Sequence, residues 1–267
     1  MAKLVFLGAG NLASAIVRGL LAQQVYAPGE IACTSKTGVS AQKLADSTGI
    51  THEPDLPRLL AGADLVVLGF KPQSLAGADP RLASLTAGTL VLSVLAGKKL
   101  ARLAQSFPAA RNVVRSLPNT PAAIGAGVTP WCALHPLAPA DRAIVEKLLG
   151  ALGTQFEIGE EHMDTMTAIS GSGPAFLFEY VASMRDAGVA GGLPADIAAM
   201  AALETALGAA RLLARSGETP ELLRDKVTSP NGTTFAGLQV LSERRFRETI
   251  KDTILAAARR AGELSRD

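Results

Sequence analysis

The chain has 267 residues, of which 48% are hydrophobic and 19% charged, and its formal net charge at pH 7 is +2. A chain of this length can bury the core of one large domain or of two moderate ones. The near-neutral charge, with no basic stripe and no acidic tail, argues against a nucleic-acid partner. Both cysteines, Cys33 and Cys132, lie in apolar runs, which predicts buried free thiols and gives no sign of an oxidising compartment.

The apolar segments do not predict a membrane protein. The N-terminal "MAKLVFLGAG" passes directly into a glycine turn instead of a cleavage site, so we expect no signal peptide. The most apolar window, residues 197–214, is mostly alanine and carries Glu204 and Arg211, each of which costs about 2.5–3.5 kcal/mol near a bilayer centre. We therefore expect a soluble helix, no membrane partner and a cytoplasmic protein.

The first part of the chain alternates β-rich runs with helical patterns, which predicts a parallel, doubly wound sheet of the Rossmann type. In chain order the expected elements are a strand at 3–10, a helix at 11–24, a strand at 30–35, a helix at 40–49, and strands at 63–70, 89–97, 111–118 and 127–136.

From about Glu160 onward the apolar residues recur with helical periodicity. The expected helical segments are 162–188, 194–217, 219–229, 233–244 and 245–265. Pro194 and Pro220 stand where the first turn of a helix tolerates proline, and Gly217 stands where a C-terminal cap would. The fold class is therefore an α/β Rossmann-type domain, residues 1–158, followed by an all-α domain, residues 159–267.

The stretch "FLGAGNLASAI" places Gly8, Gly10 and Ala13 in a G-x-G-x-x-A spacing between the first strand and the first helix. This spacing gives a tight turn, a backbone without Cβ atoms near a pyrophosphate, and a small residue where helix and strand pack. The alternative is a merely structural turn. Because the motif opens the first βαβ unit of the chain, dinucleotide binding is the favoured interpretation.

The end of the second expected strand indicates which dinucleotide is bound. An NAD site usually has Asp or Glu there, to bond the ribose 2′-hydroxyl, but this chain has Thr34, Ser35, Lys36 and Thr37. Hydroxyls and an ammonium group suit a 2′-phosphate, which a carboxylate would repel. We expect NADPH as the preferred cofactor and NADH as a poorer one; the alternative is a solvated loop that merely lacks an acid.

Further cofactor contacts are expected in the loops at the carboxyl ends of the strands, where ligands of such sheets bind. The full set of expected cofactor-binding residues is Gly8, Gly10, Asn11, Leu12, Ser35, Lys36, Lys71, Pro72, Ala96, Gly97 and Asn119. Among them, Lys71 precedes Pro72, which favours an extended backbone, and Asn119 belongs to a "PNTP" turn that is either part of the nicotinamide pocket or a structural turn.

No metal site is expected. The histidines His52, His135 and His162 have no metal-ligand spacing, and each is interpreted as a surface or hydrogen-bonded residue; His162 and Asp164 are the only pair on a plausible shared face. The "SGSGP" of residues 170–174 either lets the helix approach the cofactor domain closely or is simply a glycine-permitted helix start.

A short polar stretch, "SPNGTT" at residues 229–234, separates two helical segments. Pro-Asn-Gly is an ordinary turn, yet a loop that enters a helix also presents free N–H groups and the positive end of the dipole, which suits an anion. The residues alone leave both interpretations open.

Three stretches together resemble the pyrroline-5-carboxylate reductases: "FLGAGNLASAI", "RSLPNTPAAIGAGVT", and "AISGSGPAFLFEY" with the later "LRDKVTSPNGTTFAGLQVL". The resemblance covers essentially the whole chain and implies an oxidoreductase that transfers hydride from NAD(P)H to the C=N bond of 1-pyrroline-5-carboxylate, giving L-proline in the last step of proline biosynthesis. It also implies a Rossmann-type domain followed by a helical domain that forms a homodimer or a ring of dimers. The alanine-rich "AAMAALETALGAA" agrees, since small side chains let helices approach closely.

In that family the loop at residues 229–234 is the substrate site. Carried over to this chain, the Ser229 hydroxyl and the backbone amides around Gly232 and Thr233 would hold the substrate carboxylate. Thr234 would face the ring nitrogen, as the residue nearest to a catalytic role. The chain departs from the family at Asn231, where a glycine is usual. Asparagine tolerates the left-handed conformation better than most residues, but its side chain occupies space that glycine leaves open, so Asn231 is expected among the substrate-binding residues.

A second departure is Ala182, where the family often has an acid, so any acid that tunes the iminium there is missing from this chain.

The residues also bear on three rival functions. A β-hydroxyacid-type dehydrogenase would need a lysine on the first interdomain helix, and residues 161–185 contain none. A reductase of a related cyclic imine carboxylate and a non-catalytic NADP-binding sensor stay as alternatives.

Overall fold

The structure, a computed structural model, describes residues 4–265. It divides into two compact units: the first contains the chain up to Ser172 and again from Ala257, and the second contains Gly173–Ala256. The expected limits, 1–158 and 159–267, differ from this division, and the residues 1–3 and 266–267 that they include lie outside the described part. The difference arises because the segment after residue 158 packs on the sheet, where Met163 joins the core.

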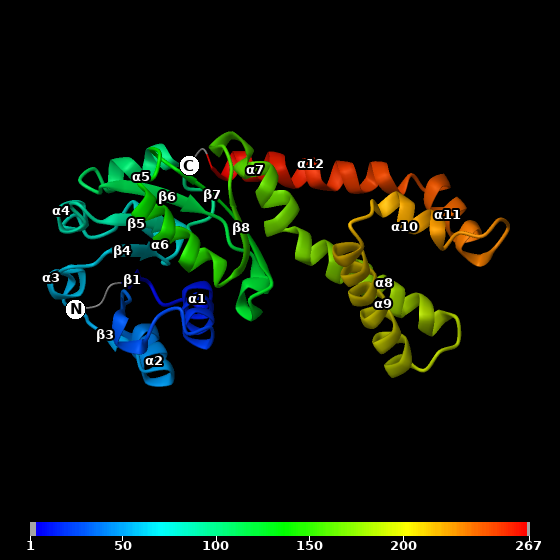
Figure 1. Ribbon diagram of the computed structural model, residues 1–267, viewed down its shortest axis with the longest axis horizontal. Coiled ribbons are helices and arrows are strands. Elements are labelled where there is room, and N and C mark those ends of the chain that lie inside the picture. Colours follow the sequence, from blue (N-terminus) through cyan, green and yellow to red (C-terminus); the bar gives the residue numbers. More distant parts are fainter. Residues whose placement is uncertain (1–3, 266–267) are drawn as a thin grey trace. The chain divides into compact units, whose positions relative to one another are not determined.

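The first unit is built on an eight-stranded sheet in the order β3-β2-β1-β4-β5-β6-β7-β8 (Figure 1). The strands are β1 (Leu4–Leu7), β2 (Ile31–Thr34), β3 (Thr51–His52), β4 (Leu65–Leu68), β5 (Leu90–Ser93), β6 (Asn112–Ser116), β7 (Gly127–Ala133) and β8 (Gly153–Glu157). Strands β1 to β6 pair in parallel, which confirms the predicted Rossmann-type topology. All six expected strands are present, although Lys3 of the first lies outside the described residues; β3 and β8 were not expected.

Strand β7 runs antiparallel to β6, and β8 runs parallel to β7. The reversal follows from the link between β6 and β7, which holds only the short 3-10 turn η3 (Thr120–Ile124). A parallel crossover needs a connection of a dozen or more residues. The parallel part of the sheet therefore ends at β6.

The sheet has a core on each face because successive side chains of a strand point to opposite sides. In β1, Leu4 and Phe6 belong to one core, and Val5 and Leu7 to the other. The first face is covered by α1 (Asn11–Ala22), α2 (Val39–Thr48) and α6 (Pro139–Gly150), and the second by α3 (Leu56–Leu60), α4 (Leu82–Leu85) and α5 (Leu100–Ser106). Strands buried on both faces read as continuous apolar runs, as the sequence of β4, "LVVL", does.

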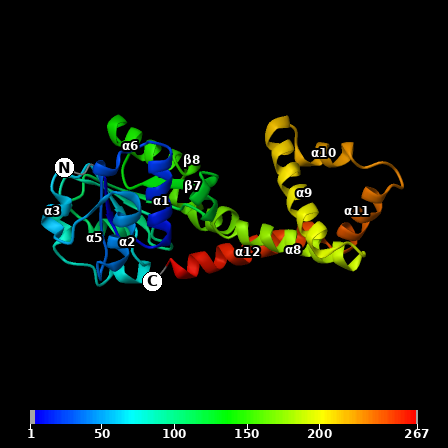
Figure 2. The same ribbon diagram turned by 90° about the horizontal axis from the view of Figure 1, so that it is seen from below.

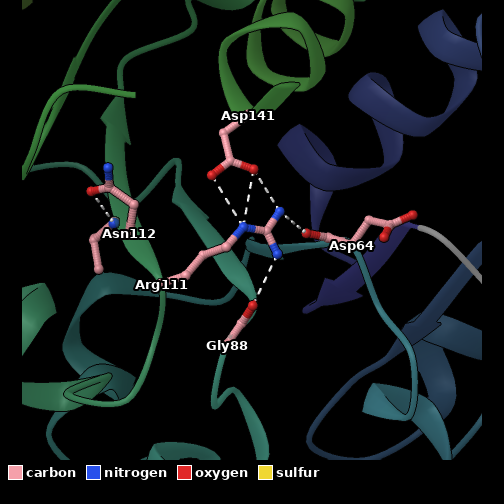
Figure 3. Close-up of polar contacts among 6 residues, drawn as sticks. Asp64, Gly88, Arg111, Asn112 and Asp141 are labelled. Carbon is pink, nitrogen blue, oxygen red and sulfur yellow. Dashed lines mark hydrogen bonds and ion pairs between the residues drawn. The ribbon is translucent and has the colours of Figure 1, made fainter. Parts of the chain in front are cut away.

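The amino ends of the central strands are joined through one side chain, Arg111 (Figure 3). Its Nε and Nη2 atoms donate to the carboxylate of Asp141 in α6, at 3.0 and 2.7 Å. Nη1 donates to the carbonyl of Gly88 and Nη2 also to that of Asp64, both at 3.0 Å. One guanidinium therefore holds the starts of β4, β5, β6 and α6 together, at the edge opposite to the carboxyl ends of the parallel strands.

At the carboxyl end of β6, Arg115 is buried with a side-chain exposure of 4%. It forms an ion pair with Glu160 of the turn η4 (Glu160–His162), at 2.9 Å. Glu160 also accepts the N–H of Leu100, the first residue of α5, at 2.7 Å. The ion pair thus fixes the segment that leads into α7 (Met163–Met166) against the sheet.

The second unit is helical, as expected. Its helices are α8 (Gly173–Ala190), α9 (Ala195–Ser216), α10 (Pro220–Lys226), α11 (Thr233–Glu243) and most of α12 (Phe246–Leu264), of which α8 and α9 pack against each other (Figure 2). Pro220 is the first residue of α10, Pro194 is the N-cap of α9, and Gly217 ends α9 in the left-handed conformation at φ 67°. The two prolines thus mark helix starts and the glycine a helix end, as the sequence predicts.

The second unit has almost no buried interior within this chain. Among its described residues only Ala198 and Ala202 are buried, whereas Phe178 is 65% exposed and Met200 57%. Helix α9 is long and apolar enough to cross a membrane by length and composition. That property is weak evidence for a span, and Glu204 and Arg211 stand inside the apolar stretch.

Candidate functional site

The turn after β1 depends on Gly8. Its φ is +111°, and a Cβ atom there would lie 2.5 Å from the carbonyl carbon of Gly69 and the nitrogen of Phe70. No side chain fits, because the loops after β1 and β4 meet at this point. The chain therefore turns sharply at the carboxyl edge of the sheet, as the glycine spacing predicts.

Gly10 is the N-cap of α1 and has no side-chain cap. The nearest atom to a Cβ placed on it would be 4.0 Å away, so the space beside it is open. Ala13 is fully buried, and a Cβ on Gly69 would lie only 2.9 Å from that of Ala13. The predicted small residue thus sits where helix and strand pack, and the amino end of α1 faces a space that an anion could occupy.

The loop after β2 contains no acid and is held by hydrogen bonds of its own. The Oγ of Ser35 accepts the N–H of Ala41 at 3.2 Å, and the carbonyl of Ser35 accepts the N–H of Gly38 at 2.9 Å. Gly38 is the N-cap of α2, at φ +76°. The Ser35 hydroxyl keeps its proton for a ligand, while Lys36 is exposed beside it.

These loops surround one pocket of about 810 Å³ at the carboxyl edge of the sheet. Nine of the eleven residues predicted to bind the cofactor line it: Gly8, Gly10, Asn11, Leu12, Ser35, Lys36, Lys71, Pro72 and Ala96. Lys71 has the extended backbone that Pro72 favours, at φ −68° and ψ 135°. Sequence segments up to 88 residues apart are thus brought to one place, with hydroxyls and two lysines on its walls.

The remaining two predicted residues lie elsewhere. Gly97 lines a neighbouring pocket of about 280 Å³ that shares Pro72 and Ala96 with the larger one. Asn119 is buried, and its side chain is used internally: Nδ2 donates to the carbonyl of Ser170 and Oδ1 accepts the N–H of Val128, both at 2.9 Å. The amide of Asn119 therefore shapes the fold, and its assignment as a cofactor contact stays a prediction.

A third pocket, of about 650 Å³, shares Gly8, Ser35, Lys36, Phe70 and Ser74 with the 810 Å³ pocket. The sequence analysis missed this extension and the residues that line it, which include Pro54, Leu56, Ala78, Arg81 and Leu82. They follow β3 and β4 and belong to no motif. The only available signal was topological, since loops at the carboxyl ends of neighbouring strands meet.

Glycine-rich turn, pocket and extension together fit a dinucleotide. The turn has no room for a Cβ where a pyrophosphate approaches, helix α1 presents its amino end, and apolar residues line the extension, as an adenine ring requires. When bound, NAD(P)H supplies a hydride to an acceptor.

The loop at residues 229–234 lies in the second unit and leads into α11. Asn231 has φ 57°, so this asparagine adopts the left-handed conformation that the usual glycine would. A Cβ on Gly232 would lie 2.3 Å from the Oγ of Ser229. A side chain at position 232 would therefore displace the Ser229 hydroxyl from its present place.

The hydrogen-bonding groups of this loop are mostly free. The N–H of Gly232 donates to the carbonyl of Ser229 at 3.0 Å, so this amide is used inside the turn. Within residues 4–265, the N–H groups of Thr233 and Thr234 and the hydroxyls of Ser229, Thr233 and Thr234 have no hydrogen-bond partner. The open amides are therefore those of Thr233 and Thr234 at the start of α11, one residue later than expected for the pair around Gly232 and Thr233.

Other titratable groups add no second centre. In the described part of the chain no three His, Cys, Asp or Glu side chains form a group that could hold a metal. His162 pairs with Glu161 at 3.5 Å, while Asp164 lies 3.8 Å from Arg115, so the suggested pair of His162 and Asp164 is not formed. Residues Thr167–Gly171 form a π-helical turn just before α8, which includes the first two residues of "SGSGP".

Both cysteines are free and buried, which confirms the prediction from the sequence. Burial raises the pKa of the Cys33 thiol to about 11. The pKa of Cys132 is raised to about 12, by burial first and then by the charge of Glu160. Neither thiol is a nucleophile at neutral pH.

Comparison with known proteins decides which family this arrangement belongs to. The family model described as "Pyrroline-5-carboxylate reductase dimerisation" matches residues 160–264, and "NADP oxidoreductase coenzyme F420-dependent" matches residues 3–97. A pyrroline-5-carboxylate reductase of Synechocystis sp. is 39% identical and covers 99% of this chain and 98% of the relative; one of Arabidopsis thaliana is 36% identical, over 98% and 95%. The chain belongs to the pyrroline-5-carboxylate reductase family.

Solved structures agree. The chain is similar to a pyrroline-5-carboxylate reductase of Coxiella burnetii, with a TM-score of 0.92 and 31% identity over 99% of this chain and 98% of that one. A Plasmodium falciparum pyrroline carboxylate reductase, solved with NADP bound, gives a TM-score of 0.87 and 25% identity over the same shares.

Membership confirms the resemblance and its main consequences. A pyrroline-5-carboxylate reductase is an NAD(P)H-dependent oxidoreductase that reduces the C=N bond of 1-pyrroline-5-carboxylate in proline biosynthesis, and the fold is that of the family: an NADP-binding Rossmann-type domain and a helical dimerisation domain. No finding favours a reductase of another imine or a sensor.

Proposed function

We propose that this reductase uses NADPH in preference to NADH and that the loop after β2 makes the distinction. The observation that carries the proposal is the loop itself: Ser35, Lys36, Thr37 and Ser40 line the same pocket as the glycine turn, and no acid lines that pocket. The adjoining 650 Å³ pocket contains one acid, Asp79, which is paired with Arg81. A 2′-phosphate carries nearly two negative charges. Hydroxyls, an ammonium group and the amino end of α2 stabilise those charges, whereas the 2′-hydroxyl of NADH gains less from them.

The substrate occupies the loop at residues 229–234. The amides of Thr233 and Thr234 and the Ser229 hydroxyl bind its carboxylate, and the Thr234 hydroxyl lies at the ring nitrogen, where it positions the iminium and passes on a proton. A cyclic imine accepts hydride best when protonated, so the binding site has to admit the charged ring and exclude water. Gly232 and the small side chains of the loop leave the backbone open to the ligand.

The test is the oxidation of NADPH and NADH with 1-pyrroline-5-carboxylate. We expect Lys36→Ala to raise the KM for NADPH about tenfold, the loss of one charged hydrogen bond, with little change for NADH. Ser229→Ala and Thr234→Ala should lower kcat/KM for the substrate with both cofactors. Equal effects of Lys36→Ala on the two cofactors would refute the phosphate site, and full activity in both loop variants would refute the substrate site.

The working form is a homodimer in the cytoplasm. A dimerisation domain that exposes apolar residues such as Leu177, Phe178 and Met200 in one chain, with hardly any interior of its own, needs a partner surface. A second copy supplies that surface symmetrically. We assign the completion of each active site to this pairing, with the cofactor pocket from one subunit and the substrate loop from its partner; dimers can assemble further into rings.

A further inference from the structure

An arginine that no motif includes stands in the adenosine end of the cofactor site. Arg81 precedes α4 and lines the 650 Å³ pocket together with Ser35 and Lys36. The same pocket has apolar walls, to which Leu56 and Leu82 belong. The pocket therefore has a second cationic side chain, Arg81, which belongs to the segment after β4, in addition to Lys36 of the loop after β2.

Asp79 holds this arginine in a particular way. Nε of Arg81 donates to Oδ1 of Asp79 at 3.1 Å and Nη2 donates to Oδ2 at 2.8 Å. The backbone N–H of Arg81 also donates to Oδ1, at 2.9 Å. Nη1, in contrast, has no hydrogen-bond partner within residues 4–265, and the charge of Asp55 also acts on the guanidinium. The carboxylate therefore fixes one side of the guanidinium and leaves the other side free.

The pair has little value for the stability of the fold. Its side chains are 61% and 31% exposed, and the two residues are only two positions apart. Exposed ion pairs of this kind contribute little to folding. Hydrogen bonds from Arg81 lower the pKa of Asp79 below its usual value. Arg81 and Asp79 both line the 650 Å³ pocket, so the pair is placed where a bound ligand would meet it.

We propose that Arg81 is a second specificity residue for NADPH, which binds the 2′-phosphate from the side opposite to Lys36 while Asp79 holds its guanidinium in position. This inference rests on the proposed function, because it assumes that the phosphate lies at the β2 loop. A planar guanidinium suits this role, since it bonds phosphate oxygens through its free edge. Asp79 reduces the rotamer entropy that a long arginine side chain would lose on binding.

Calorimetry with adenosine 2′,5′-bisphosphate and adenosine 5′-monophosphate tests the inference without turnover. We expect Arg81→Ala to weaken binding of the bisphosphate about tenfold and that of the monophosphate by less than about twofold. The KM for NADPH should rise in parallel, with kcat unchanged. Arg102→Ala removes an equal charge from the exposed face of α5 and should change neither affinity. Equal weakening of both probes, or of neither, would overturn the role of Arg81.

Asp79→Ala separates positioning from neutralisation. If Asp79 positions Arg81, the variant binds the bisphosphate more weakly than the wild type; if Asp79 only cancels charge, removing it strengthens binding, and that result would overturn the positioning. Lys36→Ala in the same titrations isolates the underlying assumption. A normal bisphosphate affinity in Lys36→Ala would refute the phosphate site itself, whereas a loss in Lys36→Ala with none in Arg81→Ala would refute this inference alone. Thermal unfolding verifies that the exposed substitutions leave the fold intact.

Discussion

Individual residues decide the chemistry of both candidate sites by what they leave out. Gly8 lacks a Cβ where two loops meet, and Gly232 lacks one where the Ser229 hydroxyl crosses the chain. At the end of β2 the missing group is a carboxylate. A Cβ on Gly8 would collide with the backbone of the neighbouring loop, a Cβ on Gly232 would displace the Ser229 hydroxyl, and a carboxylate at the end of β2 would repel a 2′-phosphate.

Gly232 allows a sharp test at the residue scale. At φ −80° an alanine has no backbone strain, but its Cβ would displace the Ser229 Oγ, which lies 2.3 Å from that position. A serine can rotate away, so Gly232→Ala should keep the thermal unfolding temperature within about 2 °C, since the expected loss in stability is below about 1 kcal/mol. The KM for 1-pyrroline-5-carboxylate should nevertheless rise as in Ser229→Ala. A variant with normal KM would contradict the placement of the serine hydroxyl at the substrate.

The cysteines give a prediction about reactivity. Because burial raises the pKa of Cys33 to about 11 and that of Cys132 to about 12, both are protonated at pH 8. A colorimetric disulfide reagent should find no fast-reacting thiol in the native protein and two in denaturant. Ser216→Cys, at an exposed position near the end of α9, provides the positive control with one fast thiol. Fast reaction of the native wild type would show that a cysteine is accessible.

At the scale of elements, the interior strands and most long helices are predictable, and short or polar elements are not. Helix α6 is the exception among the long helices, because its twelve residues are not among the expected elements. The apolar runs of β1, β4 and β5 are buried on both faces, so composition alone reveals them. Strand β8, "GTQFE", has a polar pattern at the edge of the sheet, and β3 has only two residues. The helix α4, with four residues, is too short for helical periodicity to show.

The candidate site follows the same division. Gly8, Gly10 and Lys36 are predictable because their roles depend on local spacing around one strand end. Arg81 reaches the pocket through the topology of the sheet, from a loop with no motif, so only the folded chain reveals it. Asn119 is the opposite case: it belongs to a motif, but its side chain makes hydrogen bonds to the backbone of Ser170 and Val128 inside the protein.

Replacing Arg111 tests whether contacts at the amino ends of the strands stabilise the fold without affecting the cofactor pocket at the carboxyl ends. Arg111→Ala leaves two carbonyls and Asp141 without their donor, and water can reach a side chain that is 34% exposed. We expect the free energy of unfolding in urea to fall by about 1–2 kcal/mol. The KM for NADPH should not change, because the cofactor pocket lies at the other ends of the strands. The control Arg102→Ala, at an exposed position on α5, should leave the free energy of unfolding unchanged. An unchanged free energy of unfolding in Arg111→Ala would show that the Arg111 network does not stabilise the fold.

At the scale of the whole molecule, the second unit exposes apolar helices that a dimer would cover. Mixing two inactive variants tests whether the dimer also builds the site. A subunit with Lys36 and Gly8 replaced lacks the cofactor pocket, and a subunit with Ser229 and Thr234 replaced lacks the substrate loop. If each site takes one part from each subunit, a mixed dimer has one site with both defects and one intact site.

The expected activity of such a mixture is about one quarter of the wild-type value, because half of the randomly paired dimers are mixed and each has one working site. The variants have to be unfolded and refolded together, or expressed together, so that subunits exchange. If each site is built within one subunit, every site in the mixture keeps a defect and no activity returns. Light scattering that shows an active monomer would contradict the dimer itself.

The composition of the first unit from two separate segments has a consequence for biosynthesis. Residues from Ala257 onward belong to the same compact body as the sheet, and the carbonyl of Leu264 lies 3.2 Å from where a Cβ of Gly97 would be. The ribosome makes the sheet first, then the 84 residues of the second unit, and only then this closing segment. The nascent Rossmann-type unit consequently waits with an open side until the helices have emerged, and it is during that interval that chaperones have an exposed surface to bind.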